Sequence, residues 1–318
     1  MLLGQHVQNE FVFKLHFLRH DRLFDNNNIY TQLASKFKLV VIDLIEIKEI
    51  PDTWSKDQIK IYELYREYLI DSKDMNPEAV DEFEKLLTKW INESQIKIVS
   101  WNCNGKFREK FNEIIEEDAD IYVVQECEDP SQSTEEEYRE FAGENYFWTG
   151  HLHYKGLGIF AKDDVKLERI ETNGEFEHFI ALRVNDSFNL LGVWAMPKYV
   201  EMIHNFFDAN VDLFDENLVM CGDFNSSEVF NYHHPKAKNH TELNKKLEEK
   251  GLKSVYHDLT GDVQGEEKAM TFYQARHLNN SFHMDFVYAG ENVVKEFQIL
   301  DFYKWITVSD HLPLVFRV

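Results

Sequence analysis

Cysteine is scarce in this sequence, and long apolar runs are absent. The 318 residues include three cysteines, with no C-x-x-C pair among them, which excludes the disulfide framework of a small secreted protein. No apolar stretch reaches the roughly 20 residues that a membrane-spanning helix needs. The start, MLLGQHVQNEF, lacks the basic region and apolar core of a secretory signal. We therefore expect a cytoplasmic protein without a membrane span.

Positive charge is also in short supply. Only 34 Lys and Arg residues stand against 57 Asp and Glu residues, which gives a net charge of −23. Because every phosphate contact needs a local cation, this balance excludes a protein that holds nucleic acid by a blanket of basic residues. It does not exclude an enzyme that cuts phosphodiesters with the help of bound cations.

The chain is long enough for two parts of unequal size, and the clearest seam lies near Ser94. Residues 56–92 have apolar positions at helical spacing, whereas upstream runs are rich in Phe, Val and Ile. We predict that residues 1–94 form a small α/β or mostly helical module, which could recruit a substrate or a protein partner. Residues 95–318 would form the second domain.

The second domain has many strand-like runs with only a few helical stretches between them. The expected strands are Ile96–Trp101, Ile121–Val124, Leu157–Ala161, Phe179–Val184, Phe188–Trp194, Leu218–Cys221, Met284–Ala289 and Leu314–Val318. The expected helices are Lys106–Glu117, Glu201–Phe214 and Glu242–Lys250. This pattern predicts an α+β fold with stacked sheets flanked by helices.

Five of the strand-like runs adjoin a carboxylate, an amide or an imidazole, in the segments WNCNG, QECE, GDFNS, HMDFVY and SDH. Loops at the ends of a rigid sheet are where binding and catalytic groups concentrate. Glu126, Asp310 and Asn102 offer the hard oxygen ligands that suit Mg²⁺ or Mn²⁺. Three further side chains suit a general base, an oxyanion donor and a proton donor: Asp223, Asn225 and His311.

These five segments, in this order, resemble the endonuclease/exonuclease/phosphatase superfamily over residues 95–318, in a branch of bacterial type. The resemblance implies a four-layer α/β/β/α sandwich of two packed, mostly antiparallel sheets flanked by helices. It also implies a divalent cation, Mg²⁺ or Mn²⁺, with Glu126 as the main metal ligand, helped by Asn102 and Asp310. The cation would polarise the phosphoryl group and stabilise the leaving oxygen.

The same resemblance implies the roles of the remaining polar groups. Asp223 would orient or deprotonate the attacking water, and Asn225 would bind a phosphate oxygen. His311 would donate a hydrogen bond or a proton to the developing charge. Asp285 would hold the His311 ring and raise its pKa.

Other side chains near these segments are candidates for binding substrate. The set is Asn225, Asn104, Lys155, Trp194 and Tyr273. Many members of the superfamily carry a second histidine, or a tyrosine, near the position that Trp194 occupies here. This sequence has neither residue at that position. We expect the missing donor to come from His151, His153, His283 or Tyr154, or to be dispensed with.

The three cysteines, Cys103, Cys127 and Cys221, each stand beside a residue of these segments. Strand alternation predicts a structural role for the first two. If Asn102 and Glu126 face the site, then Cys103 and Cys127 face away from it and into the core. We interpret both as small buried apolar side chains rather than zinc ligands.

The function that we expect is metal-dependent hydrolysis of a phosphodiester, with DNA or RNA as the substrate. Two alternatives stay open: a phosphatase or phosphodiesterase for a small or lipid phosphoester, and a binding protein in which the fold persists without catalysis. The intact set of catalytic residues argues against a silent binding protein.

Overall fold

A computed structural model of the chain describes residues 95–318. The chain divides into two units between Gln95 and Ile96, and the predicted N-terminal module lies outside the described residues. Within the described range, no helix is long and apolar enough to cross a membrane.

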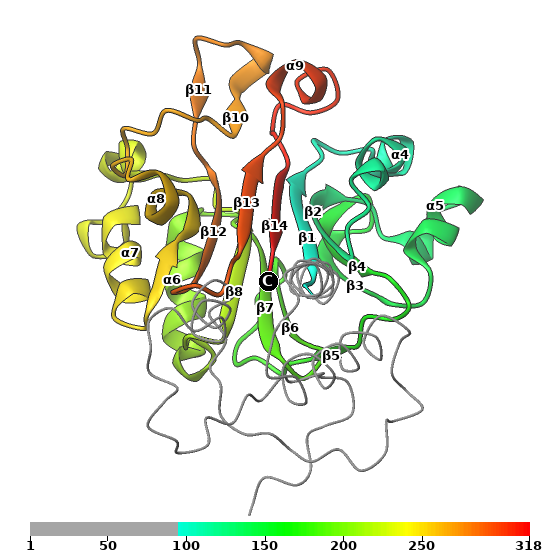
Figure 1. Ribbon diagram of the computed structural model, residues 1–318, viewed down its shortest axis with the longest axis horizontal. Helices are drawn as coiled ribbons and strands as arrows, with labels where there is room; N and C mark the ends of the chain where they lie inside the picture. The colour runs from blue at the N-terminus through cyan, green and yellow to red at the C-terminus, as the bar shows by residue number, and fades with distance from the viewer. Residues whose placement is uncertain (1–94) are drawn as a thin grey trace, which may run out of the picture. The chain divides into compact units, whose positions relative to one another are not determined.

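Two six-stranded sheets make up the frame of the second unit (Figure 1). The strand order of the first sheet is β13 (Glu296–Ile299), β14 (Leu314–Arg317), β1 (Lys97–Asn102), β2 (Ile121–Cys127), β4 (Lys155–Ala161) and β3 (Tyr146–Leu152). The strand order of the second is β5 (Leu167–Arg169), β6 (Phe179–Val184), β7 (Phe188–Trp194), β8 (Leu218–Asp223), β12 (Asp285–Gly290) and β9 (Leu252–Ser254).

Helices cover the outer face of each sheet. The first sheet has α4 (Phe111–Ile114), α5 (Glu136–Ala142) and α9 (Phe302–Trp305) beside it, and the second has α6 (Val200–Ala209), α7 (His240–Glu248) and α8 (Val255–Thr260) (Figure 1). A short hairpin of β10 (Phe272–Tyr273) and β11 (Ser281–Phe282) rises above the strands. This arrangement confirms the predicted α+β class and the α/β/β/α layers.

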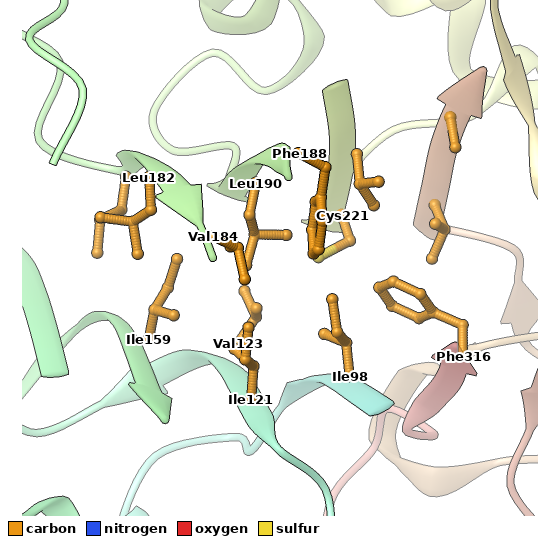
Figure 2. Packing of buried hydrophobic residues seen from close by; sticks show 14 of the residues in the cluster. Ile98, Ile121, Val123, Ile159, Leu182, Val184, Phe188, Leu190, Cys221 and Phe316 are labelled. Carbon is orange, nitrogen blue, oxygen red and sulfur yellow. The ribbon is translucent and has the colours of Figure 1, made fainter. Parts of the chain in front are cut away.

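Strand alternation sorts the side chains into three apolar clusters. The cluster between the two sheets takes every second residue of each central strand, for example Ile121 and Val123 from β2, and Val219 and Cys221 from β8 (Figure 2). The intervening residues pack under the outer helices. Because the inter-sheet layer is apolar along most of its depth, polar side chains that face this layer gather at its edge.

Each sheet contains one parallel pair, and the other neighbours are antiparallel. β1 runs parallel to β2, and β7 runs parallel to β8. The carboxyl ends of parallel strands meet at the same edge of a sheet, which is where open α/β sheets bind ligands. A hydrogen bond from Asn102, at the end of β1, to Asp223, at the end of β8, joins these edges across the two sheets. This common edge is where the candidate site lies.

Two predicted helices are shorter than the sequence pattern suggests. Residues 107–117 form two 3₁₀ turns around the single-turn α4, after Lys106 adopts a left-handed conformation. The helix predicted over 201–214 ends at Ala209, because Asn210 has non-helical backbone angles. The side-chain amide of Asn210 donates a hydrogen bond to the carbonyl of Phe206. Both endings depend on local capping, which apolar spacing alone does not reveal.

Candidate active site

Asp223 is fully buried at the carboxyl end of β8, on the face that looks into the inter-sheet layer. The preceding residue, Gly222, lets the backbone of β8 reach this position. It has a φ of 147°, and a Cβ atom there would lie 1.8 Å from the carbonyl oxygen of Val193 on β7. Only glycine permits so close an approach. Gly222 therefore lets β7 and β8 pair closely at this point.

The carboxylate of Asp223 is held by amide groups. Asn102 donates its side-chain amide to Oδ2 at 2.9 Å, and Asn225 donates its own to the same oxygen at 2.8 Å. The backbone N–H of Asn225 bonds to the other oxygen, Oδ1, at 2.8 Å. Asn225 has a φ of 48°, which asparagine tolerates better than most residues. These bonds fix the direction of the carboxylate.

His311 and Asp285 form a buried pair facing Asp223. The His311 Nδ1 atom lies 2.9 Å from one carboxylate oxygen of Asp285 and 3.1 Å from the other. The backbone of His311 is fixed as well, since its N–H donates to the Ser309 hydroxyl and its carbonyl accepts the Trp101 indole N–H. Asp285 and Asp223 are partners in the β12–β8 register. The ring orientation of His311 is therefore set from both ends.

Burial and neighbouring charges shift the pKa values of His311 and Asp223. Burial alone would lower the pKa of His311, but the carboxylates of Asp285 and Asp223 raise it to about 10. Burial raises the pKa of Asp223 to about 7, partly opposed by His311. At neutral pH the imidazole therefore carries a proton, and Asp223 is poised between its two forms.

One possible ligand atom from each of Asp223, Asp285 and His311 lies within 4.8 Å of the other two. This buried cluster could hold a metal ion. It differs from the metal ligands expected from the sequence and consists of residues expected to be catalytic.

The expected metal ligands lie beside this cluster. Glu126 sits in a β-bulge of β2 with a φ of 64°, and its Oε2 lies 2.9 Å from the Lys155 ammonium. Asp310 accepts a 2.5 Å hydrogen bond from the side chain of Asn104. Asn104 in turn donates its backbone N–H to Asn102 at 2.9 Å. The loop after β1 thus links Asn102 and Asp310.

The sequence matches a family profile over residues 99–311, described as the Endonuclease/Exonuclease/phosphatase family. The chain belongs to this family. A search of curated proteins found no match to the sequence.

Solved structures share the family's fold with this chain. An AP endonuclease from Archaeoglobus fulgidus has a TM-score of 0.53 and 19% identity over 70% of this chain and 98% of its own. A 3′ phosphatase from Neisseria bound to a product DNA hairpin has a TM-score of 0.51 and 17% identity over the same shares. The endonuclease domain of TRAS1, a telomere-specific non-LTR retrotransposon, has a TM-score of 0.50 and 15% identity, again over 70% and 98%.

Two predicted substrate-binding residues of this family member are largely buried. Tyr273 is 9% exposed, and its ring packs 4.6 Å from that of Phe302, which leaves little surface for stacking on a base. Trp194 is 4% exposed at the end of β7. Lys155 is half-exposed, and its ammonium lies 5.5 Å from the centre of the Trp194 ring. Asn104 is exposed on the loop after β1.

The candidates for the missing histidine are spread apart. His283 packs against Tyr256 and Phe286, on the face of β12 opposite to that of Asp285, so it points away from the site. His151 and Tyr154 are exposed around the turn between β3 and β4; His153 is exposed there too. None of the four contacts the His311–Asp285 pair in the described residues.

Three further residues hold the groups of the site in position. Thr271 accepts the backbone N–H groups of Met284 and Asp285 at 3.0 Å each. Ser309 joins the site to β1 by donating its hydroxyl to the carbonyl of Asn102 at 2.8 Å. The ring of His178 lies 4.9 Å from that of Trp194. Ser309 directly precedes Asp310 and could have been found from that position, whereas His178 lies far from any recognised segment.

Proposed function

We propose that this chain is a divalent-metal-dependent phosphodiester hydrolase that cuts DNA or RNA by attack of water on phosphorus. The observation that carries the proposal is the buried His311–Asp285 pair, which faces an amide-held Asp223 at the common edge of both sheets. A cation, a carboxylate with a pKa near neutrality and fixed amide donors are the groups that phosphoryl transfer requires.

His311 acts on the phosphoryl group in this proposal. Its Nδ1–H donates a hydrogen bond to Asp285, so the Nε2–H remains to donate to a phosphate oxygen. The raised pKa keeps the ring positively charged at neutral pH. The charge therefore favours the extra negative charge of the transition state over the ground state.

Asp223 orients or deprotonates the attacking water. Asn102 and Asn225 fix its carboxylate, and its pKa of about 7 matches a base that works near neutral pH. The Asn225 amide keeps a second N–H, since only one is used toward Asp223. That N–H is free to bind a phosphate oxygen.

Glu126, Asn102 and Asp310 are the residues that would hold Mg²⁺ or Mn²⁺. They fit such a cation, because all three present oxygen donors and the Glu126 carboxylate already balances one positive charge, that of Lys155. When bound, the cation supplies Lewis-acid polarisation of the phosphoryl oxygen and stabilises the leaving oxygen.

Cations beside the site support a polyanionic substrate. Lys110 donates its ammonium to the carbonyl of Cys103, and Arg276 donates its guanidinium to the carbonyls of Thr307 and Val308. Neither makes an ion pair with a carboxylate of the described residues, so both charges are available to flanking phosphates. With a net charge of −23 on the whole chain, we expect binding that weakens steeply with salt.

The test is an assay of single-stranded DNA, duplex DNA, RNA and bis-p-nitrophenyl phosphate with Mg²⁺, Mn²⁺ or EDTA. Asp223→Asn is the inactive control, since it keeps the side-chain shape and removes the charge. Metal-dependent cleavage of a polymer by the wild type alone supports the proposal. Turnover of the small ester without any polymer cleavage would point to a small or lipid phosphoester, and no turnover at all would contradict the proposal.

A further inference from the structure

The indole of Trp194 has a buried N–H group without an acceptor. Its Nε1 atom is one of the buried polar atoms of the described residues that make no hydrogen bond. An indole nitrogen can only donate, so the missing partner must be an acceptor. Native structures rarely leave such a donor unpaired, and exceptions often mark a functional site.

The position of Trp194 places this donor beside the catalytic carboxylate. Trp194 and Asp223 are register partners at the ends of the parallel strands β7 and β8. Both side chains face the layer between the sheets, since Leu190 and Val219, at even spacing before them, belong to the inter-sheet cluster. Neighbouring strands lie about 4.8 Å apart. The indole is therefore a direct neighbour of the Asp223 side chain and yet makes no hydrogen bond to it.

A cation lies beside the indole at this edge. The Lys155 ammonium lies 5.5 Å from the ring centre and pairs with Glu126. An anionic oxygen drawn to this ammonium would meet an indole donor that needs no deprotonation.

We propose that the Trp194 indole N–H donates a hydrogen bond to an anionic oxygen of the substrate phosphoryl group. This inference rests on the proposed function and assigns the donor on the β7 side of the same site. An indole N–H donates a hydrogen bond but cannot exchange a proton in the pH range of the folded protein. The donor is therefore active at every pH at which the protein is folded.

The direct test is a ¹⁵N–¹H spectrum of the indole groups during titration with inorganic phosphate, with and without MgCl₂. The chain has six tryptophans, and Trp194→Phe identifies the resonance of Trp194 by its loss. We expect that resonance to move with saturation, and the resonance of Trp148 to stay in place, because the Trp148 N–H is already bonded to the carbonyl of Cys127.

The kinetic test compares Trp194→Phe, Trp194→His and Trp148→Phe on the substrate that the wild type cleaves. Trp194→Phe should lower kcat/KM by about ten- to a hundredfold, the effect of losing one donor to a charged group. Trp194→His, which restores an N–H, should recover part of this loss. The thermal midpoint should fall less for Trp194→Phe than for Trp148→Phe, because only the second variant loses a hydrogen bond that exists in the free protein.

The outcomes separate this inference from the proposed function. An active wild type whose Trp194 resonance ignores phosphate, together with full activity of Trp194→Phe, overturns the inference and leaves the hydrolase intact. A resonance that responds to phosphate in a protein that cleaves no phosphoester overturns the proposed function and supports the anion contact.

Discussion

Replacing Asp285 with asparagine should change the alkaline side of the pH–rate profile. The substitution keeps an oxygen that can accept the His311 Nδ1–H, and it removes the charge that lies 2.9 Å away. The pKa of His311 stands at about 10 against an ordinary value of 6.5. Multiplied by about 1.36 kcal/mol per unit, the difference favours the imidazolium by about 5 kcal/mol. Loss of one adjacent opposite charge typically lowers a pKa by about 1–3 units.

We therefore expect the His311 ring of Asp285→Asn to lose its proton near pH 8. The measurement is kcat/KM for the wild-type substrate between pH 6 and 9.5 at fixed salt and metal concentrations. Above its lowered pKa the variant should lose about tenfold per pH unit, or about thirtyfold by pH 9.5. The wild type should keep more than half of its rate at pH 9.5, since its pKa of about 10 lies above this range.

The matched control is Asp212→Asn, which removes an exposed carboxylate from the 3₁₀ turn after α6. It should reproduce the wild-type profile. If the alkaline limb of Asp285→Asn coincides with that of the wild type, the charge of Asp285 does not hold the proton on His311, and the assigned role of the pair is wrong.

Further predictions concern the metal, the packing of β8 and acid stability. Glu126→Gln should raise the Mg²⁺ concentration needed for half-maximal activity by at least about tenfold without lowering the thermal midpoint, as titration of activity and calorimetry would reveal. Gly222→Ala should cost about 3 kcal/mol or more in urea unfolding, because its Cβ would meet the Val193 carbonyl at 1.8 Å; Gly261→Ala, with nothing within 4 Å, should cost only about 1 kcal/mol, and equal losses would refute the steric argument. Burial lowers the pKa of His240 to about 3, so between pH 6.5 and 3 the unfolded state binds a proton that the folded state does not. As the pH decreases through this window, the free energy of unfolding should fall by up to about 1.4 kcal/mol per pH unit. A His240→Asn variant with the same acid slope would exclude this residue as the cause.

The central strands could be predicted from the sequence, whereas the edge strands could not. β6 and β7 match the predicted ranges residue for residue, because both are long apolar runs buried on two faces. β3 was missed because it is only partly buried and does not alternate, and β13 because its alternation covers only four residues. The two-residue strands β10 and β11 have too few residues for any periodicity.

The polar groups of the site were readable from the sequence, but their partners were not. Asp285 and His311 are 26 residues apart, and their pairing rested on the family resemblance before the structure brought them within 2.9 Å. The β-bulge at Glu126 and the unpaired Trp194 N–H depend on register and packing between strands. Such features have no local sequence signal, because they arise only where distant segments meet.

The parallel pairs in the two sheets have a consequence for how activity emerges during folding. The groups of the site come from the ends of β1, β2, β7 and β8, from the start of β12 and from the segment before β14. They span the chain from Asn102 to His311. Parallel pairing requires long crossovers, and contacts of such sequence separation form slowly. A fragment that ends before β14 lacks the strand that follows His311. The site is therefore incomplete until β14 docks, and recovery of turnover after dilution from denaturant should lag behind recovery of secondary structure.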